Sequence, residues 1–334
     1  MLIEAENLYR FYGETCAVAD LSLTLKKGEI LGFLGPNGAG KTTTMQMLCG
    51  NLAPSSGQVR IHGIDLLDQP KEAKRHLGYL PEIPPLYREL TVDEYLSYCA
   101  RLHALKGEAV RRAVEEAKAR CGLAESGRRL IGNLSKGFQQ RVGIAQAILH
   151  SPPVVVLDEP TVGLDPIQIQ EIRELIRELG REHAVLLSTH ILPEVQAVCS
   201  RVLIIRQGRL ALNATAEELE HHMYASSLVL ETRTPIDIDL LMTLESVQSV
   251  IQEPDRHNRY KVFSAHETNP AEAIAELVVK KGWGLLELSP VRRSIEQIFM
   301  DIAKQEPSAP AGKPEWVPES SSERTHPGKE AHPS

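Results

Sequence analysis

The stretch from Ile30 to Thr43, Ile-Leu-Gly-Phe-Leu-Gly-Pro-Asn-Gly-Ala-Gly-Lys-Thr-Thr, constrains the fold more than any other part of the chain. Its apolar beginning predicts a short buried strand, and its threonine-rich end predicts a helix. Between them, Gly35, Gly40, Lys41 and Thr42 fit the pattern G-x-x-x-x-G-K-[ST], in which backbone N–H groups surround a phosphate without obstruction from Cβ atoms. A glycine turn that merely joins a strand to a helix is the alternative. The strand, loop and helix context is the one that the phosphate-binding motif needs, and it favours the phosphate site.

We call the loop and helical start that carry this motif the phosphate cradle. It consists of Gly35, Pro36, Asn37, Gly38, Ala39, Gly40, Lys41, Thr42 and Thr43. Lys41 is expected to reach the β- and γ-phosphates of a nucleotide, and the Thr42 hydroxyl suits Mg²⁺. The helix that begins near Lys41 adds unpaired N–H groups and the positive end of its dipole.

Length and charge narrow the class of protein further. A chain of 334 residues is long enough for about two domains and needs no disulfide to support its core. Its net charge of -7 has the wrong sign for a dedicated nucleic-acid binder, so no nucleic-acid partner is expected. The five cysteines are scattered and form no metal-ligand spacing, which favours reduced thiols in the cytosol.

Membrane association is expected only through a partner chain. The N-terminal residues Met1–Glu4 lack the basic and apolar regions of a signal peptide. No apolar run approaches the roughly 18 to 20 residues that are needed to cross a bilayer.

Two features of the first ninety residues bear on ligand or partner contacts. Tyr12 lies upstream of the cradle and suits stacking on an adenine ring, although a lone tyrosine is usually packed against the protein. A predicted strand at Leu77–Leu80 leads into the proline-rich apolar loop Glu82–Tyr87. Such a loop is either a packed connector or an exposed docking surface, and the sequence favours neither.

The chain from about residue 84 to residue 150 is predicted to form a helical subdomain. Thr91 and Glu94 form a capping-box pattern at the start of one helix, and a second helix keeps apolar residues from Val110 to Cys121 on one face. Ser135 is suited to cap a further helix, which leaves N–H groups and a positive dipole end for an anion. A plain helix cap is the simpler explanation for Ser135 taken alone.

Acidic and histidine side chains follow two predicted core strands. Asp158 and Glu159 end the apolar run that begins at Val154, and His190 follows the run Ala184–Thr189. Because the carboxyl ends of parallel strands meet at the ligand-binding edge of an α/β sheet, we expect these three side chains near the cradle. Asp158 is expected to hold Mg²⁺, Glu159 to orient or deprotonate the attacking water, and His190 to contact the γ-phosphate. A lone histidine is usually structural, and its place beside two carboxylates favours this role.

The helix between those two strands is predicted to begin and end at recognisable residues. Asp165 is suited to cap it, Pro166 to be its first helical residue, and Gly180 to stop it. Apolar residues recur between them at helical spacing, so one face is expected to be buried.

The chain changes character after about residue 225. Residues 1–225 are predicted to form the domain that carries the cradle, residues 226–305 a small α+β domain without a catalytic group, and residues 306–334 a disordered tail. The elements expected in the small domain are strands at Ser227–Glu231, Arg259–Phe263 and Gly284–Leu288 and helices at Pro270–Lys281 and Ser294–Lys304.

Taken in order, these motifs resemble the ATP-binding subunit of an ABC transporter over about residues 2–220. The cradle is similar to the Walker A loop of that family, and Val154–Glu159 is similar to its Walker B strand with the catalytic glutamate. The resemblance implies that Tyr12 is the adenine-stacking aromatic, Asp165 the D-loop aspartate and His190 the switch histidine. The residues similar to the family's signature motif, which covers ATP bound to another subunit, are Ser135, Lys136, Gly137 and Phe138.

Two departures from the family pattern lie near the expected nucleotide. The usual signature reads Leu-Ser-Gly-Gly-Gln, whereas this chain has Lys136 in the third position, which adds a positive charge, and Phe138 in the fifth, which removes a polar side chain. At the Q-loop the family commonly has glutamine, whereas Glu82 can approach Mg²⁺ but cannot donate a hydrogen bond as an amide does. Both departures are similar to a subset of the ABC-2 exporter branch, the gliding-motility-associated and copper-enzyme-maturation ATPases.

The resemblance implies an α/β fold: a P-loop NTPase of ABC type with a mixed sheet core, an antiparallel β subdomain and a helical subdomain. It also implies an ATPase that uses ATP and Mg²⁺. Its catalytic residues would be Lys41, Glu159 and His190, and its Mg²⁺ ligands Thr42, Asp158 and Glu82. A second ATP-binding subunit, expected to be an identical copy, would join head to tail. The loop Glu82–Tyr87 would dock on an integral membrane permease, so that the cytoplasmic chain lies peripherally on the cytoplasmic face of the membrane.

An ABC-2 type exporter subunit is therefore the expected function. The alternative is a soluble ABC-type ATPase that acts as a mechanical or regulatory module on ribosomes or DNA. Such proteins usually carry two cassettes or long coiled-coil insertions, and this chain has one cassette and no heptad pattern. A degenerate nucleotide-binding scaffold is disfavoured because Lys41, Asp158, Glu159 and His190 are all present.

Overall fold

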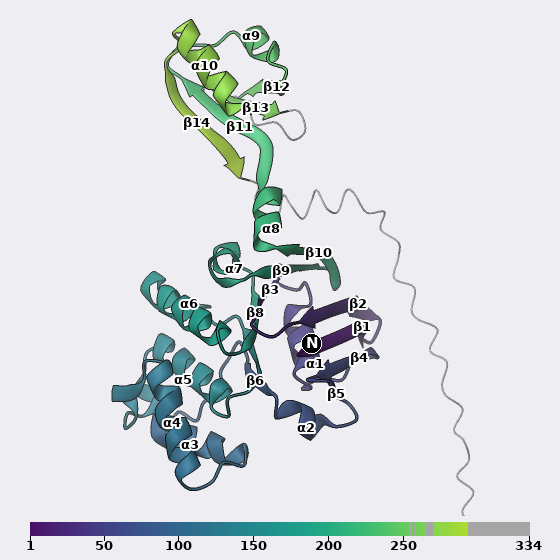
Figure 1. Ribbon diagram of the computed structural model, residues 1–334, viewed down its shortest axis with the longest axis vertical. Coiled ribbons are helices and arrows are strands. Elements are labelled where there is room, and N and C mark those ends of the chain that lie inside the picture. Colours follow the sequence, from purple (N-terminus) through teal and green to yellow (C-terminus); the bar gives the residue numbers. More distant parts are fainter. Residues whose placement is uncertain (254–255, 257, 265–269, 293–334) are drawn as a thin grey trace, which may run out of the picture.

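The computed structural model describes residues 1–253, 256, 258–264 and 270–292. Its central layer is a six-stranded sheet in which β10 pairs antiparallel with β9 and all other neighbouring strands are parallel (Figure 1). In spatial order the strands are β10 (Arg209–Thr215), β9 (Arg201–Arg206), β3 (Ile30–Leu34), β8 (Ala184–Thr189), β7 (Val154–Asp158) and β6 (Leu77–Leu80). The core strands that the apolar runs predict are thereby confirmed.

The central strands are buried on both faces, which explains why their sequences are continuously apolar. In β8, Ala184 and Leu186 belong to the core on one side of the sheet, and Val185 and Leu187 belong to the core on the other. The helices packed against the two sides are α1 (Lys41–Leu48) on the first, and α6 (Pro166–Gly180) and α7 (Leu192–Val198) on the second. A shift of such a strand by one residue would move each side chain into the core on the opposite side, where its size and shape do not fit, so the register is fixed by packing.

An antiparallel sheet covers the side of the central sheet that carries α1. Its strands in spatial order are β2 (Thr15–Leu25), β1 (Ile3–Tyr12), β4 (Ser56–Ile61) and β5 (Ile64–Asp65), and α2 (Pro70–Lys74) follows β5 in the chain. The apolar residues of β1, β2 and β4 join the core that contains α1. The antiparallel strands predicted before the cradle are confirmed.

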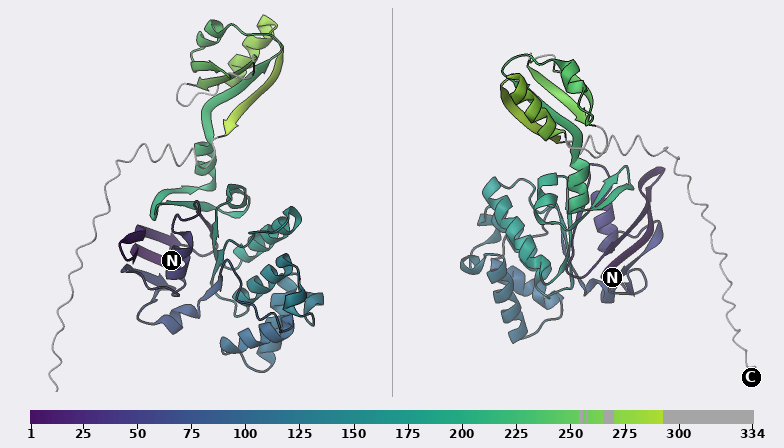
Figure 2. Two further views of the ribbon diagram at one scale, coloured as in Figure 1. Left: turned by 180° about the vertical axis from the view of Figure 1, so that it is seen from behind. Right: turned by 45° about the horizontal axis from the view of Figure 1, so that its top comes forward.

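A helical region lies on the other side, between β6 and β7 in the chain (Figures 1 and 2). It contains α3 (Val92–Leu102), α4 (Glu108–Arg120), α5 (Lys136–Ile148) and 3₁₀ turns at Ala124–Ser126 and Ile131–Asn133. The predicted capping box is confirmed, because the Thr91 hydroxyl accepts from the Glu94 N–H while the Glu94 carboxylate accepts from the Thr91 N–H at 2.8 Å. Ser135 caps α5 by accepting from the Phe138 N–H.

A third sheet with its own core follows α8 (Ala216–Met223), and Figures 1 and 2 show it at the far end of that helix. Its strands in spatial order are β12 (Val247–Gln252), β13 (Arg259–Ser264), β11 (Tyr224–Thr232) and β14 (Leu285–Arg292), with helices α9 (Ile238–Met242) and α10 (Ala271–Lys281). Leu230, Val262 and Ile274 are completely buried at its centre.

The sequence predicts most, but not all, of this third unit. Strands β11, β13 and β14 and helix α10 are confirmed. Strand β12 and helix α9 were not predicted, since β12 is an edge strand with largely exposed side chains and α9 has only five residues. The helix predicted at Ser294–Lys304 and the tail predicted for residues 306–334 lie outside the described residues.

Arg201 connects the antiparallel sheet to the central sheet. Its Nε lies 2.6 Å from Oε1 of Glu29, its Nη2 donates to the Thr24 carbonyl at 2.6 Å, and its Nη1 donates to Asn213 at 3.1 Å. Both charged side chains are mostly buried, with exposed fractions of 19% for Arg201 and 11% for Glu29. The end of β2, the start of β3 and strand β10 are thus held by one guanidinium.

Replacing this guanidinium tests the connection. Arg201→Met is expected to lower the free energy of unfolding by about 2 to 4 kcal/mol in urea titrations, because Glu29 keeps a mostly buried charge without its partner. Arg111→Met is the matched control: its ion pairs with Glu108 and Glu115 are exposed, and its loss is expected to cost less than about 1 kcal/mol. Equal losses in the two variants would contradict the connecting role.

Candidate nucleotide-binding site

Four parallel strands bring the predicted site residues to one edge of the central sheet. The carboxyl end of β3 leads into the cradle, that of β8 into His190, that of β7 into Glu159, and that of β6 into Glu82. The register pairs Leu34 with Thr189 and Asp158 with Ser188, so these strands end almost level with one another. Residues more than a hundred positions apart in sequence therefore meet at the edge where open α/β sheets bind ligands.

The glycines of the cradle are required by the protein as well as by a ligand. A Cβ atom on Gly35 would lie 2.6 Å from the Ile205 carbonyl oxygen of β9, and one on Gly40 would lie 2.7 Å from the Ala17 carbonyl oxygen of β2. Gly40 also has a φ of 103°, which a residue with a side chain adopts only with strain. The close approach of β2 and β9, which the sequence does not reveal, thus explains part of the motif.

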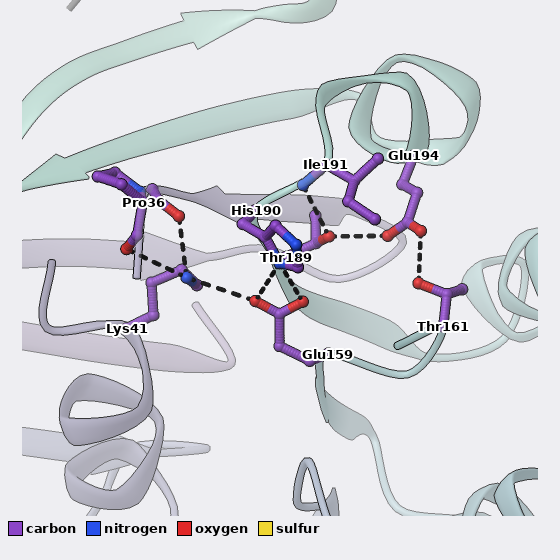
Figure 3. A network of polar contacts seen from close by, with 9 residues as sticks. Pro36, Lys41, Glu159, Thr161, Thr189, His190, Ile191 and Glu194 are labelled. Carbon is purple, nitrogen blue, oxygen red and sulfur yellow. Dashed lines mark hydrogen bonds and ion pairs between the residues drawn. The ribbon is translucent and has the colours of Figure 1, made fainter. Parts of the chain in front are cut away.

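Lys41 is held at the mouth of the cradle (Figure 3). Its Nζ donates to the carbonyl oxygens of Gly35 at 2.9 Å and Pro36 at 3.3 Å, and lies 3.4 Å from Oε1 of Glu159. Only 7% of the side chain is exposed, so the ammonium group acts in a region of low dielectric where its field is weakly screened. The arrangement places a fixed positive charge at the predicted phosphate position.

Glu159 and His190 face each other across the same edge (Figure 3). The His190 Nδ1 lies 2.9 Å and 3.1 Å from the two carboxylate oxygens of Glu159. Glu159 has a φ of 49°, an uncommon conformation for a residue with a side chain, and its N–H donates to the Ser188 carbonyl at 2.9 Å. Strained backbone of this kind is concentrated at functional sites, because the surrounding structure must hold it.

A cavity of about 430 Å³ opens between these groups. Its lining consists of Ala17, Asn37, Gly38, Gly40, Lys41, Thr42, Thr43, Glu82, Glu159, Val162 and His190. The volume lies within the range of small-molecule sites, and the convergence of backbone N–H groups, one lysine and two carboxylates matches the chemistry of a nucleotide with its cation.

Asp158 lies behind this cavity and fits a metal ligand. The residue is completely buried and neither carboxylate oxygen has a hydrogen-bond partner. Burial raises the pKa of Asp158 to about 6; the charges of Glu159 and Glu82 add to this shift, and the neighbouring Ser188 hydroxyl and Lys41 ammonium group oppose it. An unpaired buried carboxylate is costly, and a divalent cation would remove that cost.

The residues around Asp158 suit Mg²⁺ that also binds phosphates. Such Mg²⁺ takes one or two protein ligands and completes its shell with water and phosphate oxygens. Thr42 and Glu82 line the cavity and offer the further oxygens. Among the described residues, no group of three or more acidic, histidine or cysteine side chains forms a metal site that is complete by itself.

The signature residues are not brought to this cavity within one chain. They lie at the start of α5, where a Cβ on Gly137 would meet the side chain of Gln168 and one on Gly163 would meet the ammonium group of Lys136. Asp165 caps α6 by accepting from the Gln168 N–H at 2.9 Å. The signature and D-loop residues therefore lie together on one surface of the chain, outside the cavity. Phe138 is 36% exposed on this surface.

Tyr12 lies at the end of β1 and is 48% exposed. The guanidinium of Arg10 lies 4.8 Å from the centre of its ring. The ring is thus not packed in the core, and it is not among the residues that line the cavity. Adenine stacking stays a prediction.

Three polar residues beside the site were not singled out from the sequence: Thr161, Thr189 and Glu194. All are buried, and the two threonine hydroxyls bind the carboxylate of Glu194 (Figure 3). A signal was available, since Thr189 interrupts an apolar core strand and Glu194 is an acid in the first turn of the helix that follows His190. Neither feature reveals that Glu194 binds both Thr189 and Thr161.

The fold and this site define a P-loop NTPase, and comparison with known proteins identifies its family. Residues 18–162 match the family model described as ABC transporter. The chain is 31% identical over 301 residues to the uncharacterized ABC transporter ATP-binding protein YxlF of Bacillus subtilis, covering 90% of this chain and 99% of YxlF. It is 41% identical over 211 residues to the bacitracin transport ATP-binding protein BcrA of Bacillus licheniformis, covering 63% and 68%. It is 30% identical over 305 residues to the linearmycin resistance ATP-binding protein LnrL of Bacillus subtilis, covering 90% and 98%.

Solved structures agree with this assignment. A structure described as the ATP-binding subunit of an ABC transporter is 32% identical, has a TM-score of 0.61 and covers 66% of this chain and 92% of its own. A dimeric ATP-binding cassette in a post-hydrolysis state, bound to ADP and Pi, is 25% identical, has a TM-score of 0.59 and covers 64% and 98%.

The chain belongs to the family of ABC transporter ATP-binding proteins. It is an ATP-binding and ATP-hydrolysing subunit, and its relatives do not favour the alternative of an ATPase that acts outside transport. Within the described part of the chain, no helix has the length and hydropathy that a membrane crossing requires.

Asp158→Asn tests the metal-ligand assignment. Without Mg²⁺ at about pH 7.5, this variant is expected to be more stable to unfolding than the wild type by about 1 to 3 kcal/mol. The reason is that a carboxyl whose folded pKa is raised from 3.8 to about 6 stabilises the fold when protonated, and this stabilisation is lost as the pH rises through that interval.

The measurement is unfolding at about pH 5 and about pH 7.5, with and without Mg²⁺. Added Mg²⁺ is expected to stabilise the wild type at the higher pH and to leave Asp158→Asn unchanged. An equal response of both proteins to Mg²⁺ would rule out Asp158 as a ligand.

Proposed function

We propose that this chain powers the export of a substrate through a separate membrane permease of the ABC-2 type. The observation that carries the proposal is the loop Glu82–Tyr87, which joins the nucleotide cavity to an exposed apolar surface. Glu82 lines the cavity, while Ile83 is 83% exposed and Tyr87 is 46% exposed. The exposure of these apolar side chains is explained if a partner protein covers them.

The exposed surface continues onto α3. The Tyr87 ring packs against Tyr95 with centroids 6.1 Å apart and against Tyr98 with centroids 5.8 Å apart, and the Tyr95 hydroxyl donates to the Pro85 carbonyl at 3.2 Å. We call the exposed residues Ile83, Tyr87, Tyr98 and Leu102 the tyrosine patch. Because Ile83 and Tyr87 of the patch share one short loop with Glu82, movement at the cavity would be passed directly to a docked permease. The chain would then lie on the cytoplasmic face of the membrane.

The direction of transport rests on the relatives. Two of them carry names that refer to bacitracin transport and linearmycin resistance. An ATP-binding protein can contribute to resistance by powering the removal of a toxic compound from the cell, and this supports export for the present chain. The transported compound would be chosen by the permease.

We infer that two copies of the chain act as a head-to-tail dimer. The signature residues Ser135 to Phe138 and the D-loop residue Asp165 lie together on a surface outside the chain's own cavity. In a head-to-tail arrangement they would cover ATP held by the cradle of the other copy, with Tyr12 stacked on its adenine. The dimeric cassette among the solved structures supports the formation of a dimer.

In the proposed reaction, Lys41 neutralises the β- and γ-phosphates, Glu159 orients or deprotonates the attacking water, and His190 holds the γ-phosphate. The contact between His190 Nδ1 and Glu159 favours a proton on Nδ1, which fixes the orientation of the imidazole ring. Mg²⁺ held by Asp158, Thr42 and Glu82 would supply further positive charge to the phosphates.

The domain boundaries complete the proposal. Residues 1–225 would form the ATP-binding domain, with the helical subdomain at about residues 84–150. Residues 226–305 would form an accessory domain, which is supported by the separate core around Leu230 and Val262.

Glu159→Gln tests the catalytic role directly. The amide keeps the shape of the side chain but cannot accept a proton, so ATP hydrolysis is expected to fall by at least about 100-fold while ATP still binds. Size-exclusion chromatography with ATP and Mg²⁺ should then show a trapped dimer. Hydrolysis at the wild-type rate would remove Glu159 from its role, and a variant that stays monomeric with ATP bound would count against the dimer.

Substitutions in the tyrosine patch test the docking proposal. Tyr87→Ala and Ile83→Asp are expected to reduce co-purification with a multi-spanning membrane protein by about tenfold or more, because a well-packed aromatic anchor contributes strongly to an interface. ATP binding should be unchanged. Val279→Asp, which alters an apolar side chain that is 71% exposed on α10, is the control and should keep the complex. An intact complex with both patch variants would place the docking surface elsewhere.

A further inference from the structure

Glu194 is a buried acid whose position the proposed mechanism does not explain. It lies in the first turn of α7 and is 1% exposed. Among the described residues it forms no ion pair with a lysine, arginine or histidine, although buried carboxylates usually have a cationic partner. Its two oxygens are instead hydrogen bonded to two threonine hydroxyls, as Figure 3 shows.

The two threonines belong to the two segments that carry the catalytic groups. Thr161 comes two residues after Glu159 and donates to Oε1 of Glu194. Thr189 immediately precedes His190 and donates to Oε2 at 2.8 Å. The Thr189 oxygen also accepts from the Ile191 N–H at 3.1 Å, so His190 is flanked on both sides by groups in this network.

The helix that carries Glu194 is itself firmly placed. A Cβ atom on Gly32 would lie 2.9 Å from a methyl group of Val195 and 3.0 Å from the sulfur of Cys199, so α7 lies against the backbone of β3. Strand β3 leads into the cradle. The carboxylate of Glu194 thus holds the segments that follow β7 and β8 in place relative to β3, the strand that positions Lys41.

We infer that Glu194 is a positioning residue for ATP hydrolysis, which sets the spacing between Glu159 and His190 by binding Thr161 and Thr189 with one carboxylate. The inference rests on the roles proposed for Glu159 and His190. Glu194 does not touch the cavity, so it acts through these neighbours. A displacement of about 1 Å between reacting groups is enough to lower a rate by about 100-fold, and a bridge of this kind prevents it.

The first experiment compares Glu194→Ala with Glu194→Gln in the full-length chain. Glu194→Ala is expected to lower kcat by about 10- to 100-fold and to change the KM for ATP by less than about threefold, because the cradle is untouched. Glu194→Gln is expected to stay within about threefold of the wild-type kcat, since its amide oxygen accepts from Thr189 and its amide nitrogen donates to Thr161. Thermal unfolding gives the folded fraction of each variant.

The second experiment is a double-mutant cycle on the two threonines. Thr161→Val and Thr189→Val are each expected to lower kcat by about three- to tenfold, and the double variant to lower it no further than the more damaging single one, because both bonds end on the same carboxylate. Thr215→Val is the control: it removes the hydroxyl that caps α8 away from the site and should leave kcat unchanged.

Three results would overturn the inference. They are independent, multiplying effects of the two threonine substitutions, a loss in Glu194→Gln as large as that in Glu194→Ala at equal folded fraction, and a wild-type kcat in Glu194→Ala. Failure of the proposed function itself is distinguishable, because Glu159→Gln would then retain turnover whatever the Glu194 variants do.

Discussion

The nucleotide site depends on the burial of the central strands on both faces. Because a one-residue shift of β3, β8 or β7 would move each side chain into the core on the opposite side, where it does not fit, their carboxyl ends are fixed relative to one another. Lys41, Glu159 and His190 take their places from those strand ends. The geometry of the site is thus a consequence of core packing, and Glu194 adds a polar restraint where the strands have ended and the packing no longer acts.

Charge is the second constraint, because the site is far from neutral. Asp158, Glu159 and Glu82 bring three carboxylates around one lysine, and the pKa of Asp158 is raised mainly by burial. Such a group of acids is costly to keep in a folded protein without cations. The fold tolerates it because the apolar cores on either side of the sheet stabilise the strands that carry it. Local destabilisation at a site, compensated by the core, is the usual pattern in binding proteins.

Most of the site could be predicted from sequence because its signals are local. The cradle is one continuous motif, Asp158 and Glu159 end an apolar run, and the ABC-type fold and ATPase function followed from these motifs and are confirmed. What could not be predicted depends on contacts between distant segments. The carbonyl group of Ala17 approaches Gly40, which is 23 positions away, and the carboxylate of Glu194 binds Thr161, which is 33 positions away, as well as the nearby Thr189.

Gly180 illustrates the same limit within one helix: predicted as a helix stop, it is instead the last residue of α6, and a Cβ there would meet the side chain of Ile30.

Glu82 shows what such contacts mean for function. As a glutamine it would leave two carboxylates near the cradle, whereas as a glutamate it makes three, and a nucleotide without a cation would be repelled by all of them. The same side chain begins the loop that ends at Tyr87. If Glu82 makes binding depend on a metal ion, the same residue also connects the cavity to the tyrosine patch. A permease docked on that patch, as proposed, would then respond to the nucleotide together with its cation rather than to the nucleotide alone.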